Sequence, residues 1–377
     1  MSKKVLITGG AGFIGSNLAL KLISKNYTVT VLDNLSPQIH GDPKDSPLYN
    51  SIKDKVNFIE GDVRCEKDWE KALVNIDIVV HLAAETGTGQ SMYCIQKYID
   101  VNINGTGILL DYLVNHKHHI SKVVIASSRA IYGEGKYYCK KHGNVYPEDR
   151  LEINLSLAKF DPVCPICSGN VELKSTDENS KIHPSSIYGI TKQNQEQMIL
   201  NVCQSLKIPA VAFRYQNVYG PGQSLKNPYT GILSIFSTQI KNNNAINIFE
   251  DGKESRDFVY IDDVVNATIL GIESDDANFE VFNVGSGTPT SVSSIAKMLK
   301  ENYKSNIDIE ISGNYRVGDI RHNYADLSKI KSKLGFTPSI SIDLGITYFT
   351  RWVDNQEISF DNYNKSIAEL KEKGLFK

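Results

Sequence analysis

A tyrosine and a lysine occur four residues apart in the segment Tyr188-x-x-x-Lys192. If this segment is helical, both side chains lie on the same face. A phenol with its ordinary pKa of about 10 is a poor base at neutral pH, but a nearby ammonium stabilises the phenolate and brings the group into a working range. The pair is therefore a candidate general base, although the same spacing is common on the surface of amphipathic helices. A second candidate group, Ser127-Ser128, ends an apolar segment.

A glycine-rich turn follows the first apolar segment of the chain. Gly10, Gly12 and Gly15 fit the pattern G-x-G-x-x-G, and Gly9, Gly12 and Gly15 fit the related pattern G-x-x-G-x-x-G. Glycines at these positions permit a tight turn and a close approach to a pyrophosphate, whose charge then lies at a helix N-terminus. We predict a dinucleotide site here, with a purely structural turn as the alternative.

The preferred dinucleotide follows from Asp33, at the end of the second predicted strand. A carboxylate there accepts hydrogen bonds from the adenosine ribose hydroxyls and repels a 2′-phosphate. The next residues, Asn34 and Leu35, provide no arginine for such a phosphate, so NAD is favoured over NADP. With a dinucleotide turn in the same chain, catalysis explains Tyr188 and Lys192 better than an amphipathic surface does.

Four residues of metal-binding type are grouped between residues 134 and 182. Cys139 and His142 form one pair, Cys164 and Cys167 form another, and 21 residues separate His142 from Cys164. This spacing is close to that of a structural zinc ribbon, with tetrahedral Cys₃His coordination and no open position for catalysis. We predict a zinc ion that folds a segment too poor in apolar residues to fold alone. The alternative is three free thiols and a surface histidine.

The bulk composition argues against several kinds of partner. The formal net charge is −2, and carboxylates balance the basic residues near the cysteines, so nucleic-acid binding is not expected. No apolar run approaches the roughly 20 residues that span a bilayer, and the run at Val5 is too short for the core of a signal peptide. We therefore expect a cytoplasmic protein with reduced thiols, which favours metal binding over disulfides.

The order of the apolar segments predicts the fold that must position these groups. Short β-rich segments alternate with helical ones in the first half of the chain. Because such strands are covered on both faces, the pattern predicts an α/β fold with a doubly wound parallel sheet of the Rossmann type. The strand candidates are Lys4–Thr8, Thr28–Asp33, Val56–Asp62, Ile78–Ala83 and Lys122–Ser128, and the longest helical candidate is Met92–Asn115.

Changes in this pattern indicate the domain organisation. We expect a dinucleotide-binding domain over residues 1–216, which includes the zinc-ribbon-like insert over 134–182. Residues 217–377 are expected to form a smaller mixed α/β domain for the substrate, with residues 255–275 returning to the first domain. The charged stretch Asn355–Lys377 is expected to form a solvated surface helix.

Motifs along nearly the whole chain resemble those of extended short-chain dehydrogenases/reductases, and specifically of nucleotide-sugar epimerases. The matching segments are TGGAGFIGS, VLDNLS, GDVR, HLAA, VNINGTG, SSRAIYG, YGITK and FRYQNVYGPG, followed by ESRDFVYIDDV, FNVGSG and GDIRHNYAD. Within that family, SSRAIYGEG, the NPYTGILSIF segment and the Cys/His insert most resemble dTDP-L-rhamnose 4-epimerases. The resemblance also implies a homodimer formed through the helices within Met92–Asn115 and Ser186–Leu206.

The resemblance implies a role for each candidate residue. Tyr188 would take the proton of a sugar hydroxyl, Ser128 would hydrogen-bond the same oxygen, and Lys192 would also contact the nicotinamide ribose. The residues implied to hold the diphosphate and the sugar are Asn217, Arg256 and Arg321. Forked guanidinium groups suit that task, but surface ion pairing is the alternative for both arginines. The other residues implied to bind NAD are Gly9, Gly12, Phe13, Ile14, Gly15, Asp33, Asn34, Asp62, Val63, Ala83 and Ala84.

The residues that follow Ser128 restrict the reaction. Similar sugar dehydratases carry an Asp-Glu pair there, whereas this chain has Arg129 and Ala130. Dehydration and decarboxylation need an acidic residue and are not expected, which leaves 4-epimerisation through a transient 4-keto sugar. That reaction has no net redox change, so NAD stays bound in an enclosed site. The alternatives are a net 4-ketosugar reductase or dehydrogenase that uses the same residues, and a non-catalytic NAD-sensing protein.

Overall fold

A seven-stranded parallel sheet forms the centre of the chain. The computed structural model describes residues 2–227, 229, 231–357 and 363–377. The strands are β1 (Lys4–Thr8), β2 (Thr28–Asp33), β3 (Asn57–Glu60), β4 (Ile78–His81), β5 (Lys122–Ser128), β9 (Ala210–Tyr215) and β13 (Glu280–Val284). Their order is β13-β9-β5-β4-β1-β2-β3, and every neighbouring pair is parallel. The predicted doubly wound Rossmann sheet is confirmed.

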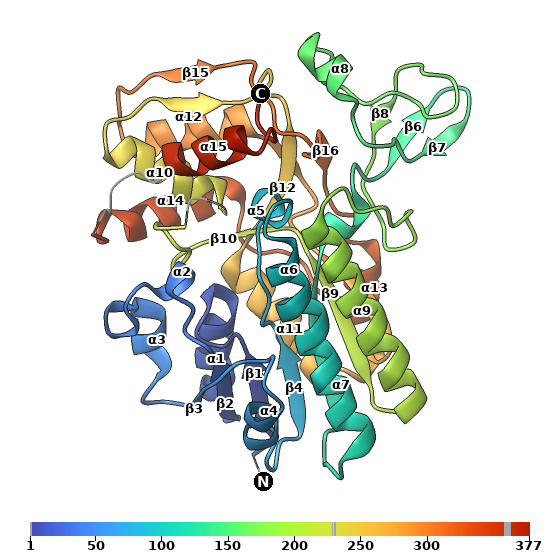
Figure 1. Cartoon of the computed structure of the whole chain (residues 1–377), viewed down its shortest axis with the longest axis vertical. Helices are drawn as coiled ribbons and strands as arrows, with labels where there is room; N and C mark the ends of the chain where they lie inside the picture. The colour runs from blue at the N-terminus through green and yellow to red at the C-terminus, as the bar shows by residue number, and fades with distance from the viewer. Residues whose placement is uncertain (1, 228, 230, 358–362) are drawn as a thin grey trace.

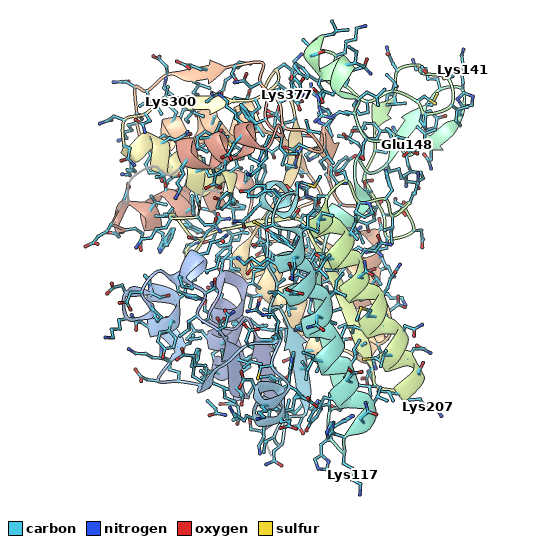
Figure 2. The ribbon with its side chains drawn as sticks, viewed as in Figure 1. Lys117, Lys141, Glu148, Lys207, Lys300 and Lys377 are labelled. Atoms are coloured by element: carbon cyan, nitrogen blue, oxygen red, sulfur yellow. The ribbon has the colours of Figure 1, made fainter. Side chains whose placement is uncertain are left out.

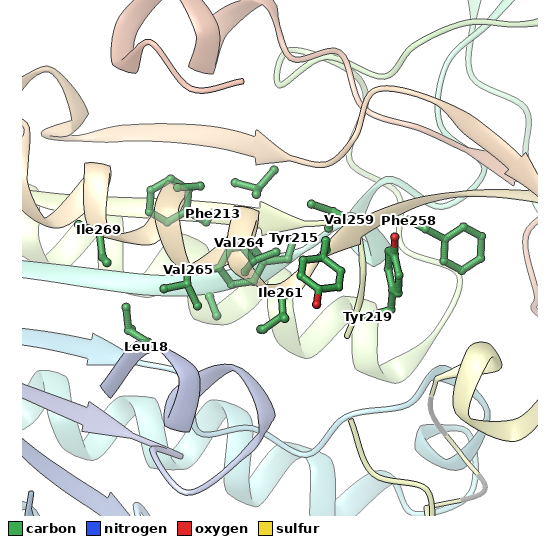
Figure 3. Close-up of a cluster of buried hydrophobic side chains, with 14 of the residues drawn as sticks. Leu18, Phe213, Tyr215, Tyr219, Phe258, Val259, Ile261, Val264, Val265 and Ile269 are labelled. Carbon is green, nitrogen blue, oxygen red and sulfur yellow. The ribbon is translucent and has the colours of Figure 1, made fainter. Parts of the chain in front are cut away.

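Helices cover both faces of this sheet, because successive strand residues point to opposite sides. Val5 and Ile7 belong to one apolar core, and Leu6 between them belongs to the other. The first core includes α1 (Phe13–Ser24) and α11 (Ile261–Glu273), and Figure 3 shows Leu18 of α1 near Val265 of α11. The second core includes α4 (Glu66–Ala72), α7 (Gly105–Asn115) and α9 (Ile187–Leu206).

The helix predicted over Met92–Asn115 is interrupted by a wider turn. It consists of α6 (Ile95–Tyr98), the π-helical segment η2 (Ile99–Asn104) and α7. Asn102, in the π-helical segment, bonds the backbone N and O of Glu85 at 2.7 and 3.1 Å and the Thr191 hydroxyl at 2.9 Å. π-Helical turns occur frequently at functional sites, and this one fixes the loop after β4 to α9.

The second half of the chain forms smaller sheets above the carboxyl edge of the central one (Figure 1). β12 (Ser255–Tyr260) pairs with β10 (Asn217–Tyr219), β14 (Pro289–Ser291) and β16 (His322–Asn323), and β11 (Ile246–Ile248) pairs with β15 (Ile309–Ile311). The associated helices are α10 (Ile232–Lys241), α12 (Val292–Asn302), α13 (Ser328–Leu334), α14 (Ile342–Asp354) and α15 (Tyr363–Glu372). Of the segment expected to return to the first domain, α11 packs against α1, whereas β12 stays in the second sheet.

The last helix differs from the solvated helix that the charged sequence predicts. Residues 358–362 lie outside the described part of the chain, and so do Pro228 and Thr230 of the NPYTGILSIF segment. Within α15, Leu370 is only 5% exposed, and Phe376 beyond the helix is 4% exposed. Glu369 accepts hydrogen bonds from the hydroxyls of Tyr93 (3.1 Å) and Tyr229 (2.6 Å). One face of this helix is therefore buried, because apolar residues occur among its charges.

The insert forms a small three-stranded antiparallel sheet at the edge of the molecule. Its strands are β6 (Tyr137–Cys139), β7 (Gly143–Val145) and β8 (Glu172–Leu173), and its helix is α8 (Glu152–Ser156). Figure 2 shows Lys141 and Glu148 on this projecting part. The buried members of its apolar cluster are Tyr137, Cys139, Val145 and Cys164. So small a core needs another source of stability.

Short elements complete the fold. They are α2 (Pro37–His40), η1 (Pro43–Asp45), α3 (Pro47–Ile52), α5 (Thr88–Ser91), η3 (Arg129–Tyr132) and η4 (Asp275–Ala277). Across the described residues, every helix is too short or too polar to cross a membrane.

Candidate active site

A single large cavity of about 1210 Å³ lies at the carboxyl ends of the central strands. It is lined by residues that follow or end five strands, namely Gly9, Asp33, Ala83, Ser128 and Gln216, and by residues of the second half such as Asn217. Ligands of open α/β sheets bind at this edge. The volume exceeds the ~300–1,000 Å³ of a typical pocket for one small ligand, which leaves room for a substrate beside a cofactor.

The glycine turn after β1 has no room for side chains. A Cβ on Gly15 would lie 2.4 Å from the Gly9 carbonyl oxygen, and one on Gly9, where φ is +66°, would lie 2.9 Å from Ala83 Cα. Gly12 is the N-cap of α1, whose first turn has no acidic residue. Exposed N–H groups without a competing carboxylate suit a pyrophosphate. The turn therefore fits the dinucleotide predicted from the sequence.

Almost all the residues predicted to bind NAD line this cavity. They are Gly9, Gly12, Phe13, Ile14, Gly15, Asp33, Asn34, Val63, Ala83, Ala84 and Lys192. Asp62 lies just behind the lining, where it accepts a hydrogen bond from Asn34 Nδ2 at 2.9 Å. Hydrogen bonds from Arg64 lower the pKa of Asp62 to about 2. The Asp62 carboxylate is therefore ionised and already held by its neighbours.

Asp33 joins the ends of the first two strands. Its oxygens accept the backbone N–H groups of Ala11 and Leu35, each at 2.9 Å. The side chain is 8% exposed, and burial raises its pKa despite these bonds. Each carboxylate oxygen has a second lone pair, so the group that orders the turn can still accept a ribose hydroxyl.

The start of α9 brings Tyr188 against Ser128. Ser186 caps this helix, and its hydroxyl accepts the Gly189 N–H at 3.1 Å. A Cβ on Gly189 would lie 2.6 Å from the Ala130 carbonyl oxygen, so the glycine allows α9 to pack directly on the residues after β5. The Tyr188 phenol is hydrogen-bonded to Ser128, and both residues line the cavity.

The charges around the Tyr188 phenol oppose its desolvation. Burial raises the pKa of Tyr188, whereas the hydrogen bond with Ser128 and the positive charge of Arg129 lower it. Ser128 Oγ accepts the Ala130 N–H at 3.1 Å, so the Ser128 hydroxyl hydrogen is free to donate to an oxygen. The arrangement suits removal of a proton from an alcohol held between the two hydroxyls.

Lys192 lies one helical turn after Tyr188 and is 2% exposed. Burial lowers its pKa to about 7, with a smaller opposite effect of Glu196. Its Nζ donates to Gln195 Oε1 at 2.7 Å. Glu196 is itself paired with Arg214 at 2.6 Å and accepts the Ser127 hydroxyl at 2.5 Å. The structure thus brings all three predicted catalytic residues to one cavity.

Arg129 is a charged cavity residue that the sequence prediction did not include in the site. It lines the cavity and lies close enough to Tyr188 to influence its titration. Burial and the nearby Arg256 guanidinium lower the pKa of Arg129 to about 10, so it is cationic at neutral pH. Its position directly after Ser128 was a usable signal, because a side chain next to a catalytic serine at a strand end is directed toward the same edge.

Unpartnered amide groups also line the cavity. Within the described residues, both side-chain polar atoms of Gln216, Oδ1 of Asn217 and Oε1 of Gln223 are buried without a hydrogen-bond partner. Buried polar atoms without partners are rare in folded proteins. These atoms are therefore available to a polar ligand, and for Asn217 this agrees with the expected substrate contact.

The structure does not bring Arg256 and Arg321 to the cavity lining. Arg321 is 1% exposed and bonds Asp161 at 2.9 Å, Glu250 at 2.9 Å and Asp251 at 2.7 and 3.0 Å. Arg256 donates to Asp319 Oδ1 at 3.1 Å and to backbone carbonyls. Both guanidinium groups are held by several acceptors within the protein.

A third arginine, Arg316, lies beside the cavity lining. Its side chain is 35% exposed and pairs with Asp319 at 3.3 Å. One guanidinium nitrogen lies 3.9 Å from the position of a Cβ on Gly89, next to Thr88, which lines the cavity. No sequence feature distinguished Arg316 from Arg321, five residues later.

The four metal-binding residues of the insert meet at one point. The candidate ligand atoms of Cys139, His142, Cys164 and Cys167 all lie within 4.8 Å of one another. His142 Nδ1 is 3.6 Å from Cys139 Sγ and 3.5 Å from Cys164 Sγ, and the Cys139 and Cys167 sulfurs are 3.9 Å apart. Tetrahedral zinc with Zn–S of ~2.3 Å and Zn–N of ~2.0–2.1 Å gives S···N of about 3.6 Å and S···S of about 3.8 Å. These three distances fit that geometry, and the four residues together can hold a metal ion.

Comparison with known proteins identifies relatives over almost the whole length. The family model "NAD dependent epimerase/dehydratase family" matches residues 5–149 and 164–285. The dTDP-L-rhamnose 4-epimerase of Burkholderia thailandensis is 36% identical over 353 residues, which cover 93% of this chain and 95% of that protein. A putative UDP-glucose 4-epimerase of Methanocaldococcus jannaschii is 32% identical over 354 residues, which cover 93% of this chain and 98% of that protein.

Solved structures of similar fold contain the two kinds of ligand that the cavity suits. The UDP-glucose 4-epimerase of Thermotoga maritima with UDP-glucose has a TM-score of 0.75 and 29% identity, covering 93% of this chain and 98% of that one. The UDP-glucuronic acid 4-epimerase of Bacillus cereus, in complex with UDP-glucuronic acid and NAD, has a TM-score of 0.76 and 26% identity, covering 93% and 99%.

Proposed function

Because this chain belongs to the NAD dependent epimerase/dehydratase family, we propose that it inverts C4 of a nucleotide-linked deoxysugar, with dTDP-L-rhamnose as the substrate. It is an enzyme of the NAD-dependent nucleotide-sugar epimerase type. The observation that carries the proposed reaction is the convergence of Ser128, Tyr188 and Lys192 on a cavity large enough for two ligands. The relative named for dTDP-L-rhamnose supports the choice of sugar nucleotide.

The proposed mechanism assigns the proton transfers to Tyr188. Its phenolate takes the proton of the sugar 4-hydroxyl while the Ser128 hydroxyl donates to the same oxygen. Arg129 and the protonated form of Lys192 stabilise the phenolate. When bound, NAD supplies the hydride acceptor and then the hydride donor at C4. After the 4-keto sugar has turned over in the cavity, Tyr188 returns the proton to the oxygen, so no atom is gained or lost.

Polar atoms of the cavity wall can hold a sugar nucleotide while its 4-keto sugar rotates. Asn217, with Gln216 and Gln223, is proposed to bind polar atoms of the sugar nucleotide through the unpartnered amide atoms. Arg256 and Arg321 are proposed to act indirectly, because their guanidinium groups are bonded to carboxylates and carbonyls within the protein. The absence of a carboxylate at Arg129 and Ala130 favours epimerisation over dehydration.

The test is NMR of the purified protein with dTDP-L-rhamnose in D₂O, without added cofactor. We expect a second sugar signal with altered H4 couplings and no deuterium at C4, because the hydride that leaves C4 is the one that returns. Tyr188→Phe should lower kcat at least 10³-fold, whereas the exposed Tyr138→Phe should not change it. If dTDP-L-rhamnose is unchanged but a UDP- or GDP-sugar reacts, the sugar assignment is wrong and the mechanism stands.

The same measurement separates the alternative functions. A 4-ketosugar reductase or dehydrogenase would need added NADH or NAD in stoichiometric amounts, and a non-catalytic NAD sensor would give no product with any sugar nucleotide. The unpartnered polar atoms that line the same cavity as Ser128 and Tyr188 favour a second polar ligand beside NAD.

We further propose that the insert binds one structural zinc ion. Three of the distances between ligand atoms match tetrahedral Cys₃His coordination, and the small core of the insert explains why it needs the metal. Elemental analysis should find one zinc per chain. Cys164→Ser should lose it, whereas Cys203→Ser, which removes a buried thiol outside the cluster, should retain it. Absence of zinc from protein purified without chelators would refute this assignment.

A homodimer and a cytoplasmic location complete the proposal. Ile95, Ile99 and Ile190 are each at least 40% exposed on α6, η2 and α9, helices that contact one another (Figure 1). Such an apolar face suits contact with a second copy. Light scattering after gel filtration should give twice the chain mass of 42.0 kDa, and Ile190→Glu should reduce it. Reduced thiols in the cytoplasm agree with metal binding by the cysteines.

A further inference from the structure

We propose that Gln195 is the positioning residue of Lys192, and that its amide is oriented by a chain of hydrogen bonds that ends at the loop facing the cofactor. Gln195 is fully buried at 0% exposure and Lys192 is 2% exposed. The 2.7 Å bond from Lys192 Nζ to Gln195 Oε1 is charge-assisted when the lysine is protonated. The inference rests on the proposed function only for its kinetic part.

The neighbours of Gln195 determine which way its amide points. The Thr106 hydroxyl donates to the Asn102 carbonyl at 2.6 Å, so Thr106 Oγ1 can only accept from other groups. Gln195 approaches Thr106 Oγ1 at 2.8 Å. The group that approaches must therefore be the NH₂ end of the amide, which leaves the carbonyl oxygen toward Lys192. If the amide were reversed, its carbonyl oxygen would face Thr106 Oγ1, which can only accept, and its NH₂ group would face the Lys192 ammonium.

Hydrogen-bond directions also determine the tautomer of His81, the next member of the chain. His81 Nε2 is 3.0 Å from Thr106 Oγ1, so it carries the proton and donates. Nδ1 is then an acceptor, and it receives the Thr8 hydroxyl at 2.7 Å. Thr8 Oγ1 in turn accepts the Ala83 N–H at 3.2 Å. The links from Lys192 to Ala83 thus form one consistent series of donors and acceptors, beside which Gln195 Nε2 also lies 3.4 Å from His81 Nε2. Buried polar networks of this kind restrain their members.

The chain thus connects four elements. Lys192 and Gln195 come from α9, Thr106 from α7, His81 from β4 and Thr8 from β1. It ends at Ala83, which lines the cavity next to the glycine turn. The position of the Lys192 ammonium is therefore determined by the same backbone that shapes the cofactor side of the cavity, and not by the helix alone.

The titratable groups that face Lys192 are few. Tyr188 and Glu196 lie on its own helix, His81 approaches from β4, and Glu196 is already neutralised by Arg214. The neutral Gln195 amide is the group bonded to the ammonium. Loss of that acceptor should favour neutral Lys192, and a carboxylate in the same place should favour the cation.

The experiment compares Gln195→Met, which removes the acceptor, with Gln195→Glu, which keeps an acceptor and adds a charge. The NAD-containing enzyme is used, and the alkaline limb of kcat/KM against pH is recorded. We expect the apparent pKa of this alkaline limb to fall by at least one unit in Gln195→Met and to rise by at least one unit in Gln195→Glu. kcat at pH 7.5 should fall about tenfold only in Gln195→Met. Gln204→Met, at an exposed position of α9, is the matched control.

A substrate-free measurement separates this inference from the proposed function. The tyrosinate absorbance of each enzyme is titrated and the curve for the same variant with Tyr188→Phe is subtracted, which isolates Tyr188. Its apparent pKa should be higher in Gln195→Met than in the wild type by about one unit, whether or not dTDP-L-rhamnose reacts. Equal titrations, or limbs that move in the same direction in both variants, would show that Gln195 only fills space. If Gln195→Met does not fold, the upward shift in Gln195→Glu still decides.

Discussion

Replacement of Lys192 by methionine should make the protein more stable while it abolishes activity. The buried lysine has a pKa of about 7 in place of the ordinary 10.5. Since a tenfold change in an equilibrium constant corresponds to ~1.4 kcal/mol, the folded state destabilises the charged form by roughly 5 kcal/mol. Methionine removes that penalty but leaves Gln195 Oε1 without its donor, which costs about 1–3 kcal/mol. The expected net gain in the free energy of unfolding at pH 7 is therefore about 2–4 kcal/mol.

The pH dependence gives the clearest signature of this effect. Below pH 7 the lysine is protonated in both states, and above pH 10.5 it is neutral in both. Between these values only the unfolded chain binds the proton, so the wild-type free energy of unfolding rises with pH. From pH 7, where half of the buried lysine is still protonated, to pH 9 the wild type should gain roughly 2 kcal/mol relative to Lys192→Met.

Urea unfolding of the NAD-free proteins at pH 7 and pH 9 measures both quantities. Taking the difference between the two proteins cancels the other titrating groups, and Lys297→Met, at an exposed position of α12, provides a control that should show no such trend. The reasoning fails if the difference between wild type and Lys192→Met is constant with pH, or if Lys192→Met is the less stable protein at pH 7. A confirmed result would mean that the catalytic cation is retained at the expense of stability.

Three further predictions follow from the geometry. Gly15→Ala places a Cβ 2.4 Å from the Gly9 carbonyl and should reduce co-purified NAD at least tenfold by absorbance, whereas Gly107→Ala, with 4.0 Å of clearance, should not. Burial holds the pKa of His81 at about 3, so between pH 6.5 and 4 the wild type should lose about 3 kcal/mol more stability than His81→Gln in urea unfolding; equal losses would show that His81 does not contribute. Removal of the proposed zinc with a chelator should expose residues 146–163, which include α8, to cleavage by trypsin at Lys159, while the central sheet stays uncut. An unchanged digest would contradict a metal-dependent insert.

Local patterns were sufficient to predict the sheet and most of the cavity. The strands around Thr8, Asp33 and Ser128 end where the sequence places them, because apolar runs and turn residues are short-range signals. The glycine turn and the Tyr188–Lys192 spacing are equally local. The two pairs of metal-binding residues were found in the same way, since each pair lies within four consecutive residues.

The roles of the arginines could not be predicted from such patterns. Whether a guanidinium meets a ligand or a carboxylate depends on residues far away in the sequence, such as Asp161 and Glu250 for Arg321. Gln195 was missed for the same reason, because its orientation depends on Thr106 and His81. The buried face of α15 depends on contacts with Tyr93 and Tyr229, which composition does not reveal.

The two ends of the insert lie next to each other, and this has an evolutionary consequence. Lys174 N donates to Lys136 O at 3.0 Å, and Lys136 N donates to Thr176 Oγ1 at 3.1 Å. A segment whose entry and exit are adjacent can be gained, lengthened or lost without altering the distance between Ser128 and Tyr188, although 60 residues separate them in the sequence. The insert can therefore change in length or sequence without moving Ser128 relative to Tyr188.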